Sequence, residues 1–300
     1  MIAVIATVAA MALPQDSDSL QARIEARIKR VPGAQVGLAY IDPAAGDSVF
    51  LNADSTFHAA STMKVPVMIE LYRRAAAGGF AMNQGLLIVN RFASIADASP
   101  YSLDIASDSD TTLYERIGQR VPVDTLLRLM ITRSSNLATN TLIALVGADQ
   151  VTRTTRQLGA TRMQVLRGVE DGKAFDRGLN NTTTARDFAM VLRSIESGVA
   201  ASPAAAAQMR DILLAQEHND RIPAGLPRGV RVAHKTGEIT AHSHDGGIIY
   251  PPDRAPYVLV VLTRGIRDER VASKLIADLS AMIYAHSTRR SAQNAARSRP

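Results

Sequence analysis

The pattern of apolar and polar positions gives the chain strand-like ends and a helix-rich middle. Leu20, Ile24 and Ile28 recur at helical spacing and predict an amphipathic helix, whereas a Pro- and Gly-containing turn between two strand patterns predicts a hairpin. The expected strands are residues 36–41, 47–51, 230–236, 246–250 and 257–263. The expected helices are residues 20–30, 61–77, 122–132, 135–146, 150–158, 183–195, 203–215 and 268–284.

Strands at both ends with helices between them do not fit an alternating parallel-sheet fold. They predict an α/β fold of the α+β type, in which an antiparallel sheet built from both chain ends is covered by helices and carries an inserted all-helical domain. We assign residues 20–60 and 230–286 to the sheet domain and residues 61–229 to the helical domain. The active site is expected between the two domains.

Composition and charge narrow the function classes. The 300 residues are 46% hydrophobic and 21% charged, so most of the chain is expected to fold. Four arginines and no acid fall in residues 287–300, which we predict to be a disordered basic tail that carries much of the net charge of +6. Because the chain has no Trp and few other aromatic residues, it offers few surfaces on which bases could stack, and nucleic-acid binding is not expected.

An apolar run over residues 2–13 begins the chain. It is too short to span a bilayer and has the length of the hydrophobic region of a signal peptide, although no basic residue precedes it. Residues 10–12, Ala-Met-Ala, would supply a small-x-small cleavage site; the alternative is an apolar helix packed on the domain. We assign residues 1–19 to a signal peptide and linker, and predict an exported, periplasmic or secreted protein without stable membrane insertion. The absence of cysteine excludes disulfides and thiol nucleophiles.

The first candidate motif is Ser-Thr-Met-Lys at residues 61–64, where the strand region gives way to a helix. Positions i and i+3 share a helical face, so Ser61 and Lys64 are expected close together. Serine needs a base to become a nucleophile, and lysine can serve once burial, the helix N-terminus or a second lysine lowers its pKa. Taken alone, the motif is more readily explained as a capping serine followed by a solvent-exposed lysine.

Two further motifs follow along the chain. The Ser-Ser-Asn segment 134–136 falls between two expected helices, where a hydroxyl and an amide can project into a cleft; alone it is an N-cap. The Lys-Thr-Gly segment 235–237 ends an expected strand, and alternation places its lysine and glycine on one side. A Lys-Thr pair can hold a carboxylate, and a glycine lets a ligand approach the strand backbone, whose N–H can donate to an oxyanion.

Together and in this order, the three motifs resemble the S-x-x-K, S-x-N and K-T-G signature of the penicillin-recognising serine hydrolases. Within that group the chain is most similar to class A β-lactamases, over residues 20–286. Its loop segment 167–171 contains Glu170, 36 positions after Ser134, where class A enzymes have a glutamate. The resemblance implies a serine β-lactamase that uses no cofactor and no metal. We expect a monomer whose partner is a small-molecule β-lactam or a peptidoglycan-derived substrate.

The resemblance also implies a role for each site residue. Ser61 would attack the lactam carbonyl, with Lys64, or Glu170 through a water, as the base. Ser134 would pass the proton to the lactam nitrogen, and Glu170 would activate the water that hydrolyses the acyl-enzyme. The backbone N–H groups of Ser61 and Glu238 would hold the oxyanion. The substrate-binding set is Asn136 for the acylamide side chain, Lys235 and Thr236 for the substrate carboxylate, and Gly237 and Glu238 beside them.

The sequence departs from the class A pattern near these residues. Ala174 stands where an asparagine would hold the hydrolytic water, and Asn180 or Asn181 is the alternative holder. Ser135 stands where class A enzymes usually have aspartate, a change expected to affect loop packing more than chemistry. Glu238 follows K-T-G directly, where small residues are common, and its side chain is expected to restrict or repel anionic substrates.

Charged segments outside the motifs have simpler interpretations. Arg167 is expected to clamp its loop by pairing with an acid across the neck, with Asp187 as the candidate. Residues 79–120 exceed the usual class A length and are expected to form a lip near the cleft, with the acidic stretch 104–110 as a solvated loop. Residues 242–245, His-Ser-His-Asp, are expected to form a turn and not a metal site, since no cysteine or fitting histidine spacing supports zinc.

Two other functions remain open on the sequence alone. One is a cell-wall D-alanyl-D-alanine carboxypeptidase or another penicillin-binding serine hydrolase of the same fold, which would stay acylated by a β-lactam. The other is a non-catalytic sensor domain for β-lactams or peptidoglycan. Glu170 favours the hydrolysing enzyme, because a base that activates water permits turnover.

Overall fold

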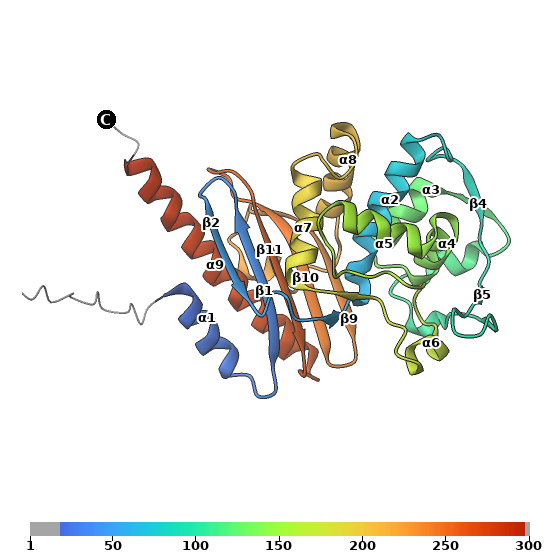
Figure 1. Ribbon diagram of the computed structural model, residues 1–300, viewed down its shortest axis with the longest axis horizontal. Coiled ribbons are helices and arrows are strands. Elements are labelled where there is room, and N and C mark those ends of the chain that lie inside the picture. The colour runs from blue at the N-terminus through green and yellow to red at the C-terminus, as the bar shows by residue number, and fades with distance from the viewer. Residues whose placement is uncertain (1–18, 298–300) are drawn as a thin grey trace, which may run out of the picture.

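The computed structural model describes residues 19–297, so the assigned signal peptide lies outside the described residues except for Ser19. Within them, a five-stranded antiparallel sheet lies beside a helical region (Figure 1). The strands are β1 (Gln35–Asp42), β2 (Asp47–Leu51), β3 (Phe57–His58), β4 (Gly85–Leu87), β5 (Phe92–Ala93), β6 (Pro100–Tyr101), β7 (Arg120–Pro122), β8 (Thr182–Thr183), β9 (Arg231–Ile239), β10 (His242–Tyr250) and β11 (Tyr257–Arg264). The α-helices are α1 (Leu20–Lys29), α2 (Lys64–Ala76), α3 (Val123–Thr132), α4 (Asn136–Val146), α5 (Ala148–Gln157), α6 (Gly172–Asp176), α7 (Ala185–Glu196), α8 (Pro203–Leu214) and α9 (Glu269–Arg297). The short 3₁₀ helices are η1 (Ala60–Met63), η2 (Ile105–Ser107), η3 (Thr112–Arg116) and η4 (Pro223–Gly225).

The sheet joins the two ends of the chain, as predicted. Its strand order is β2-β1-β11-β10-β9, and β1 pairs with β11 from Gln35 opposite Arg264 to Ile41 opposite Val258. The expected turn at residues 242–245 is wrong. These residues begin β10, because backbone pairing with β9 continues to His242 opposite Ile239. The reversal occurs before them, where Ala241 adopts a φ of 58°.

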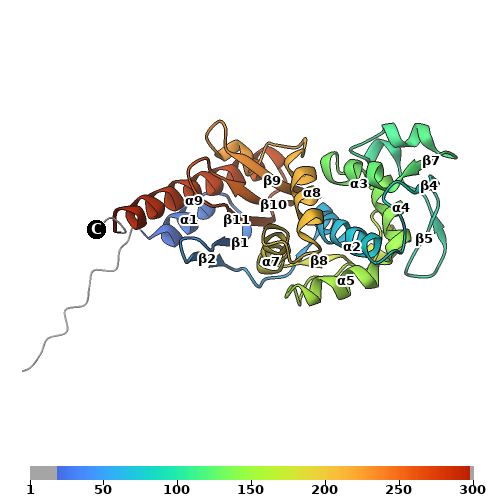
Figure 2. The ribbon, with the colours of Figure 1, turned by 90° about the horizontal axis from the view of Figure 1, so that it is seen from above.

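Helices α1 and α9 cover the face of the sheet that lies away from α2 (Figure 2). Apolar residues of both helices form one core with the sheet, including Ile24, Leu275 and Leu279, all without exposed area. Helix α9 continues to Arg297, so the prediction of a disordered tail is wrong for the part of residues 287–300 that the structure describes. Alanine, arginine and glutamine there favour helix, which lets α9 extend beyond the sheet. No helix of the described residues is long and apolar enough to cross a membrane.

The opposite face of the sheet packs against α7 and α8 and joins the helical region without a break. Phe188 of α7 approaches β10 so closely that a Cβ at Gly246 would lie 2.4 Å from its ring. A single core then runs from sheet residues such as Leu262 to Met68 in α2 and Leu142 in α4. Helix α2 is buried along most of its length, which fixes its first residue at the junction between sheet and helices.

Candidate active site

The first motif lies at this junction. Ser61 is in η1, and Lys64 is the first residue of α2, so the expected position at a helix start holds. Ala60, immediately before Ser61, has a φ of 45°, in the left-handed region that residues with a Cβ seldom adopt. Its N–H donates to Nδ1 of His58 at 3.0 Å, which holds the strained turn in place.

A serine hydroxyl connects the two motif lysines. Lys64 Nζ donates to the Ser134 carbonyl at 2.6 Å, to Ser134 Oγ at 3.1 Å and to Asn136 Oδ1 at 2.9 Å. Lys235 Nζ reaches the same Ser134 Oγ at 3.0 Å. Among the described residues, Lys64 is therefore hydrogen-bonded to the second motif instead of to Ser61. The Ser134 hydroxyl therefore joins the three motifs, which come from η1–α2, the α3–α4 connection and β9.

Burial lowers the pKa of both lysines. Neither has exposed area, and burial lowers the pKa of Lys64 to about 7, opposed by the negative charges of Asp108 and Glu170. Burial and then the charge of Lys64 lower the pKa of Lys235 well below its usual value. An amine with a pKa near 7 is partly neutral at neutral pH, so Lys64 can accept a proton there.

The third motif brings the edge of β9 against the nucleophile turn. A Cβ at Gly237 would lie 3.1 Å from the backbone nitrogens of both Ser61 and Thr62. Such distances are tighter than ordinary van der Waals contacts, so a side chain here would push β9 and η1 apart, and glycine favours their close approach. Thr236 lies on the same stretch of β9 and lines a cavity with Ser61 and Ser134.

The second motif is held by a carboxylate that the sequence did not identify. Asp108 accepts hydrogen bonds from the N–H groups of Asn136, at 2.9 and 3.0 Å, and Leu137, at 3.0 Å, and from the Tyr114 hydroxyl at 3.0 Å. The prediction of a solvated acidic loop is wrong for Asp108 and Asp110, which are both buried, and the donors at the N-terminus of α4 hold Asp108 in place. Ser135 caps the same helix with its own hydroxyl. Asp108 and Ser135 therefore both accept hydrogen bonds from backbone N–H groups at the N-terminus of α4.

Glu170 faces the second motif from the loop before α6. Its Oε1 accepts a hydrogen bond from Asn136 Nδ2 at 2.6 Å, and its Oε2 accepts one from the Asp104 N–H at 3.4 Å. Burial raises the pKa of Glu170, and the hydrogen bond from Asn136 opposes that rise. Glu170 and Ser134 have φ values of 59° and 61°, so left-handed backbone occurs at both facing residues.

Asn140 of α4 fixes the backbone beside Glu170. Its amide accepts a hydrogen bond from the Val169 N–H at 2.7 Å and donates to the Val169 carbonyl at 3.1 Å. A Cβ at Gly168 would lie 2.4 Å from Asn140 Oδ1, so the loop can approach the helix only with glycine there. On the far side of Glu170, Asp171 accepts a hydrogen bond from the Ser94 hydroxyl at 2.7 Å. Side chains on both sides thus set the position of the glutamate.

Arg167 does clamp the loop, but the expected pairing with Asp187 is wrong. Its guanidinium donates to the Leu179 carbonyl at 2.8 Å and to Asn180 Oδ1 at 3.0 Å, which closes the loop through neutral acceptors. Asp187 instead accepts hydrogen bonds from two backbone N–H groups, of Arg162 and Met163, both at 2.6 Å. The Asp187 carboxylate is therefore hydrogen-bonded to backbone at the start of the loop, and Arg167 donates to other acceptors.

The residues expected to replace the missing asparagine have structural roles. Asn181 accepts from the Leu166 N–H at 2.8 Å and donates to the Arg167 carbonyl at 3.0 Å, although it also lines the cavity in front of Glu170. Asn180 holds the guanidinium of Arg167. Ala174 is fully buried in α6 and does not line that cavity.

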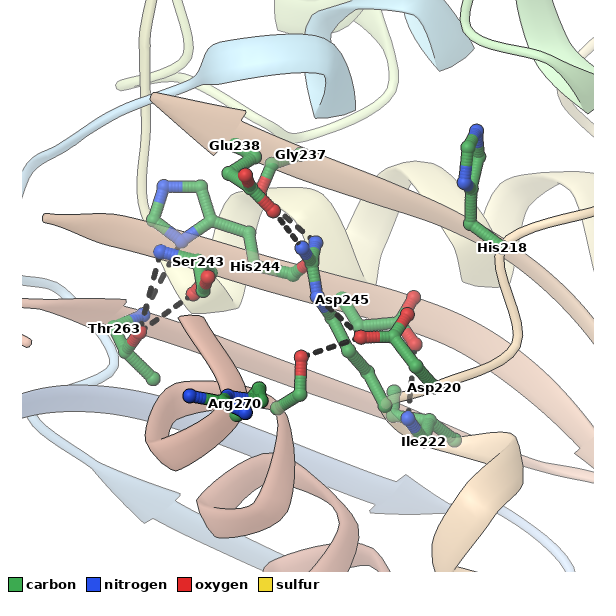
Figure 3. Close-up of polar contacts among 12 residues, drawn as sticks. His218, Asp220, Ile222, Gly237, Glu238, Ser243, His244, Asp245, Thr263 and Arg270 are labelled. Atoms are coloured by element: carbon green, nitrogen blue, oxygen red, sulfur yellow. Dashed lines mark hydrogen bonds and ion pairs between the residues drawn. The ribbon is translucent and has the colours of Figure 1, made fainter. Parts of the chain in front are cut away.

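Glu238 forms an ion pair at the end of β9. Its carboxylate pairs with Arg221, which also donates to the carbonyls of Gly237 at 3.2 Å and His244 at 3.0 Å. Figure 3 shows Glu238 and Gly237 at the end of the strand, above the loop that carries Asp220 and Ile222. Arg221 was not identified from the sequence, because it precedes β9 by a loop and belongs to no motif.

The histidines near the third motif do not form a metal site among the described residues. His244 Nδ1 accepts a hydrogen bond from the Thr263 N–H at 3.2 Å, and Nε2 lies 2.8 Å from the His58 carbonyl. Burial lowers the pKa of His244 to about 3, so the ring is neutral and serves the packing of β10.

The site residues expected from sequence surround two adjoining cavities. One, of about 270 Å³, is lined by Ser61, Asn136, Glu170 and Glu238, with Phe175 and Ile239 at its apolar side. The other, of about 490 Å³, is lined by Ser61, Ser134, Asn136, Thr236, Gly237 and Glu238, and by Ser107 and Ser109 of the 79–120 segment. That segment therefore forms a lip at the cleft, as expected. Lys64 and Lys235 lie buried beneath the lining.

The sequence and the structure are similar to those of known proteins. Residues 19–287 match the β-lactamase enzyme family. A β-lactamase of Streptomyces albus G is 28% identical over 86% of this chain and 82% of the relative. The structure of a protein named PBP-A is similar with a TM-score of 0.79 and 27% identity, over 90% of this chain and 96% of that one. The crystal structure of a β-lactamase from Sphaerobacter thermophilus gives a TM-score of 0.75 and 28% identity, over 89% and 96%.

Proposed function

This chain belongs to the β-lactamase enzyme family, and we propose that it hydrolyses β-lactams through an acyl-enzyme on Ser61. The proposal rests on one observation above all. Ser134 Oγ lies within 3.1 Å of Lys64 Nζ and 3.0 Å of Lys235 Nζ, next to the turn that presents Ser61. Burying two lysines beside one hydroxyl costs stability, and titratable groups perturbed in this way are typical of functional sites.

Acylation begins when neutral Lys64 takes the proton of Ser61 and Ser61 Oγ bonds to the lactam carbonyl carbon. As an ammonium group, Lys64 uses all three of its hydrogens on Ser134 and Asn136, so the neutral amine has one hydrogen fewer and a free electron pair. The proton then passes through the Ser134 hydroxyl to the lactam nitrogen as the carbon–nitrogen bond breaks. The alternative base for this step is Glu170 acting through a water.

Substrate binding uses the edges of the same cleft. The N–H groups of Ser61 and Glu238 would donate to the oxyanion, and the tight contact of Gly237 with η1 keeps these two backbones close. Lys235 and Thr236 would hold the substrate carboxylate. The Asn136 amide would bind the acylamide of the substrate through the second hydrogen of Nδ2, since the first is donated to Glu170.

Glu170 is the proposed base of deacylation. Its carboxylate would take a proton from a water that attacks the ester carbonyl, and Ser61 Oγ would leave as the serine is restored. The support is its place across the first cavity from Ser61, with a backbone fixed by Asn140 on one side and Asp171 on the other. A carboxylate of raised pKa is a stronger base than an ordinary one once ionised.

Turnover of a chromogenic cephalosporin by the purified protein tests the proposal, together with mass spectrometry after brief exposure to penicillin. We expect a covalent adduct on Ser61 that forms and then clears. Ser61→Ala should lower kcat/KM by about 10⁴-fold or more, because it removes the nucleophile. Ser48→Ala, an exposed serine in β2, is the matched control and should retain full activity.

The same measurement separates the rival functions. A penicillin-binding peptidase would form an adduct on Ser61 that persists, as in the penicillin G acyl-enzyme complex solved for a variant of PBP-A. A non-catalytic sensor would acylate once or not at all. An adduct that never forms would contradict both covalent functions.

We also infer from the sequence that the protein is exported and acts as a monomer without nucleic-acid partners. The inference on export rests on the apolar run at residues 2–13, and that on the substrate class rests on the family. Size-exclusion chromatography with light scattering, and N-terminal sequencing of secreted protein, are the direct checks.

A further inference from the structure

The ion pair between Glu238 and Arg221 lies inside the cleft instead of on the outer surface. Both residues line the second cavity, together with Ser61, Ser134 and Thr236. Arg221 is almost fully buried and is held by the carbonyls of Gly237 and His244, whereas the Glu238 carboxylate is partly exposed. The guanidinium is therefore fixed, and its remaining face is covered by a carboxylate of the protein itself.

This end of the cleft carries more negative than positive charge. Glu269, at the start of α9, and Asp220 line the same cavity, and burial and then Glu269 raise the pKa of Glu238, which the charge of Arg221 opposes. Burial lowers the pKa of His218, so that neighbouring ring adds no positive charge at neutral pH. Arg221 is thus the only cation among the lining residues, and Glu238 pairs with it.

We propose that Glu238 determines substrate specificity by occupying Arg221 and by favouring β-lactams that carry a positive charge next to their carboxylate. The inference rests on the proposed function, in which Lys235 and Thr236 bind that carboxylate. A substrate anion in this subsite meets no free guanidinium, so its attraction comes from Lys235 and Thr236 alone. A cationic group beside it meets Glu238 and Glu269.

Cephalosporins supply substrates that isolate this effect. Their variable substituent is attached to the ring carbon next to the one that bears the carboxylate, so it must lie near the end of β9. Cephaloridine and cephalothin share the same acylamide side chain and differ there, by a pyridinium in the first and a neutral acetoxy group in the second. The two substrates differ in intrinsic reactivity, but that difference is the same for every variant, so the change in the ratio of their kcat/KM values between two variants reports on the charge near Glu238.

The test is that ratio in the wild-type protein and in Glu238→Gln, which keeps the side-chain size and the backbone N–H. We expect the ratio of cephaloridine to cephalothin to fall by about five-fold in Glu238→Gln, the size of a partly screened charge pair. The KM for cephalothin should fall as well, because Arg221 then keeps only the longer ion pair with Asp220, at 3.9 Å, and attracts the substrate carboxylate more strongly.

Asp54→Asn is the matched control, since it removes one negative charge from a carboxylate–guanidinium pair with Arg186 that lies outside the cleft. It should leave the ratio unchanged. An unchanged ratio in Glu238→Gln, with both substrates hydrolysed, would overturn the inference and leave the proposed function intact. Failure of the wild-type protein to hydrolyse either substrate would overturn the proposed function and this inference with it.

Discussion

The two halves of the site are built in different ways. The half to which we assign acylation (the acylation half), comprising Ser61, Lys64, Ser134 and Lys235, is set by η1–α2, the start of α4 and β9, which meet in the core. The half to which we assign deacylation (the deacylation half), comprising Glu170 and the loop of residues 163–181, is set by side chains that hold loop backbone, chiefly Asn140 and Arg167. Turnover requires deacylation, so we expect it to depend on the deacylation half, which substitutions can alter more easily than the acylation half.

The two halves differ in the free energy that a disturbance costs. Moving any element of the acylation half would disturb packing between the sheet and the helices, and would leave a buried lysine without partners, a cost of about 3–5 kcal/mol. In the deacylation half, losing one hydrogen bond to loop backbone costs about 1 kcal/mol. An acyl-enzyme that forms but clears slowly is therefore the expected outcome of most damage to the loop.

The largest expected effect separates the halves directly. Glu170→Gln should still form the Ser61 adduct, whereas deacylation should slow by about 10³-fold, because the amide cannot take a proton from water. Stopped-flow acylation and the lifetime of the adduct by mass spectrometry measure the two steps. Glu115→Gln, an exposed acid in the lip segment, is the control. Steady-state turnover that survives Glu170→Gln would show that another group is the deacylating base.

A smaller effect is expected at Asp108, which links the lip to the acylation half. Acylation by the wild-type protein should rise with pH through about 7, because Lys64 acts in its neutral form and burial lowers its pKa to about 7. The Asp108 charge opposes that lowering, so Asp108→Asn should lower the pKa of Lys64 further and move this rise to lower pH. The plateau rate should fall by about tenfold, because the carboxylate no longer holds the N-terminus of α4.

Measured single-turnover rates across pH distinguish these contributions. A purely structural role of Asp108 would lower the plateau and leave the midpoint near that of the wild type. A midpoint that moves to higher pH would contradict the electrostatic assignment. Asp97→Asn, an exposed carboxylate paired with Lys173, serves as the control and should change neither quantity.

The same comparison explains which parts of the fold and the site could be predicted from the sequence. The sheet, its hairpin and the long helices follow from periodicity, and the acylation residues follow from three motifs whose spacing is local. Asp108 and Arg221 belong to no motif, because each acts on a residue distant in sequence, Asp108 on Asn136 and Arg221 on Glu238. The prediction that Asp187 pairs with Arg167 was wrong for a related reason. Sequence indicated that a clamp was needed but could not show that backbone N–H groups had already satisfied Asp187.

The smallest expected change in activity is at Ala174, where class A enzymes would have an asparagine. Ala174 is fully buried in α6, and its N–H donates to the capping carboxylate of Asp171 at 3.1 Å, so a larger polar side chain there has no path to the cavity of Glu170. Ala174→Asn should leave the deacylation rate within about twofold and lower the free energy of unfolding by about 2 kcal/mol, because it overfills the site and buries an amide. Thermal unfolding, with Ala204→Asn at an exposed position of α8 as the control, measures the second quantity. Faster deacylation without loss of stability would mean that the loop presents residue 174 to the hydrolytic water, and that the two halves of the site are less differently built than the contacts indicate.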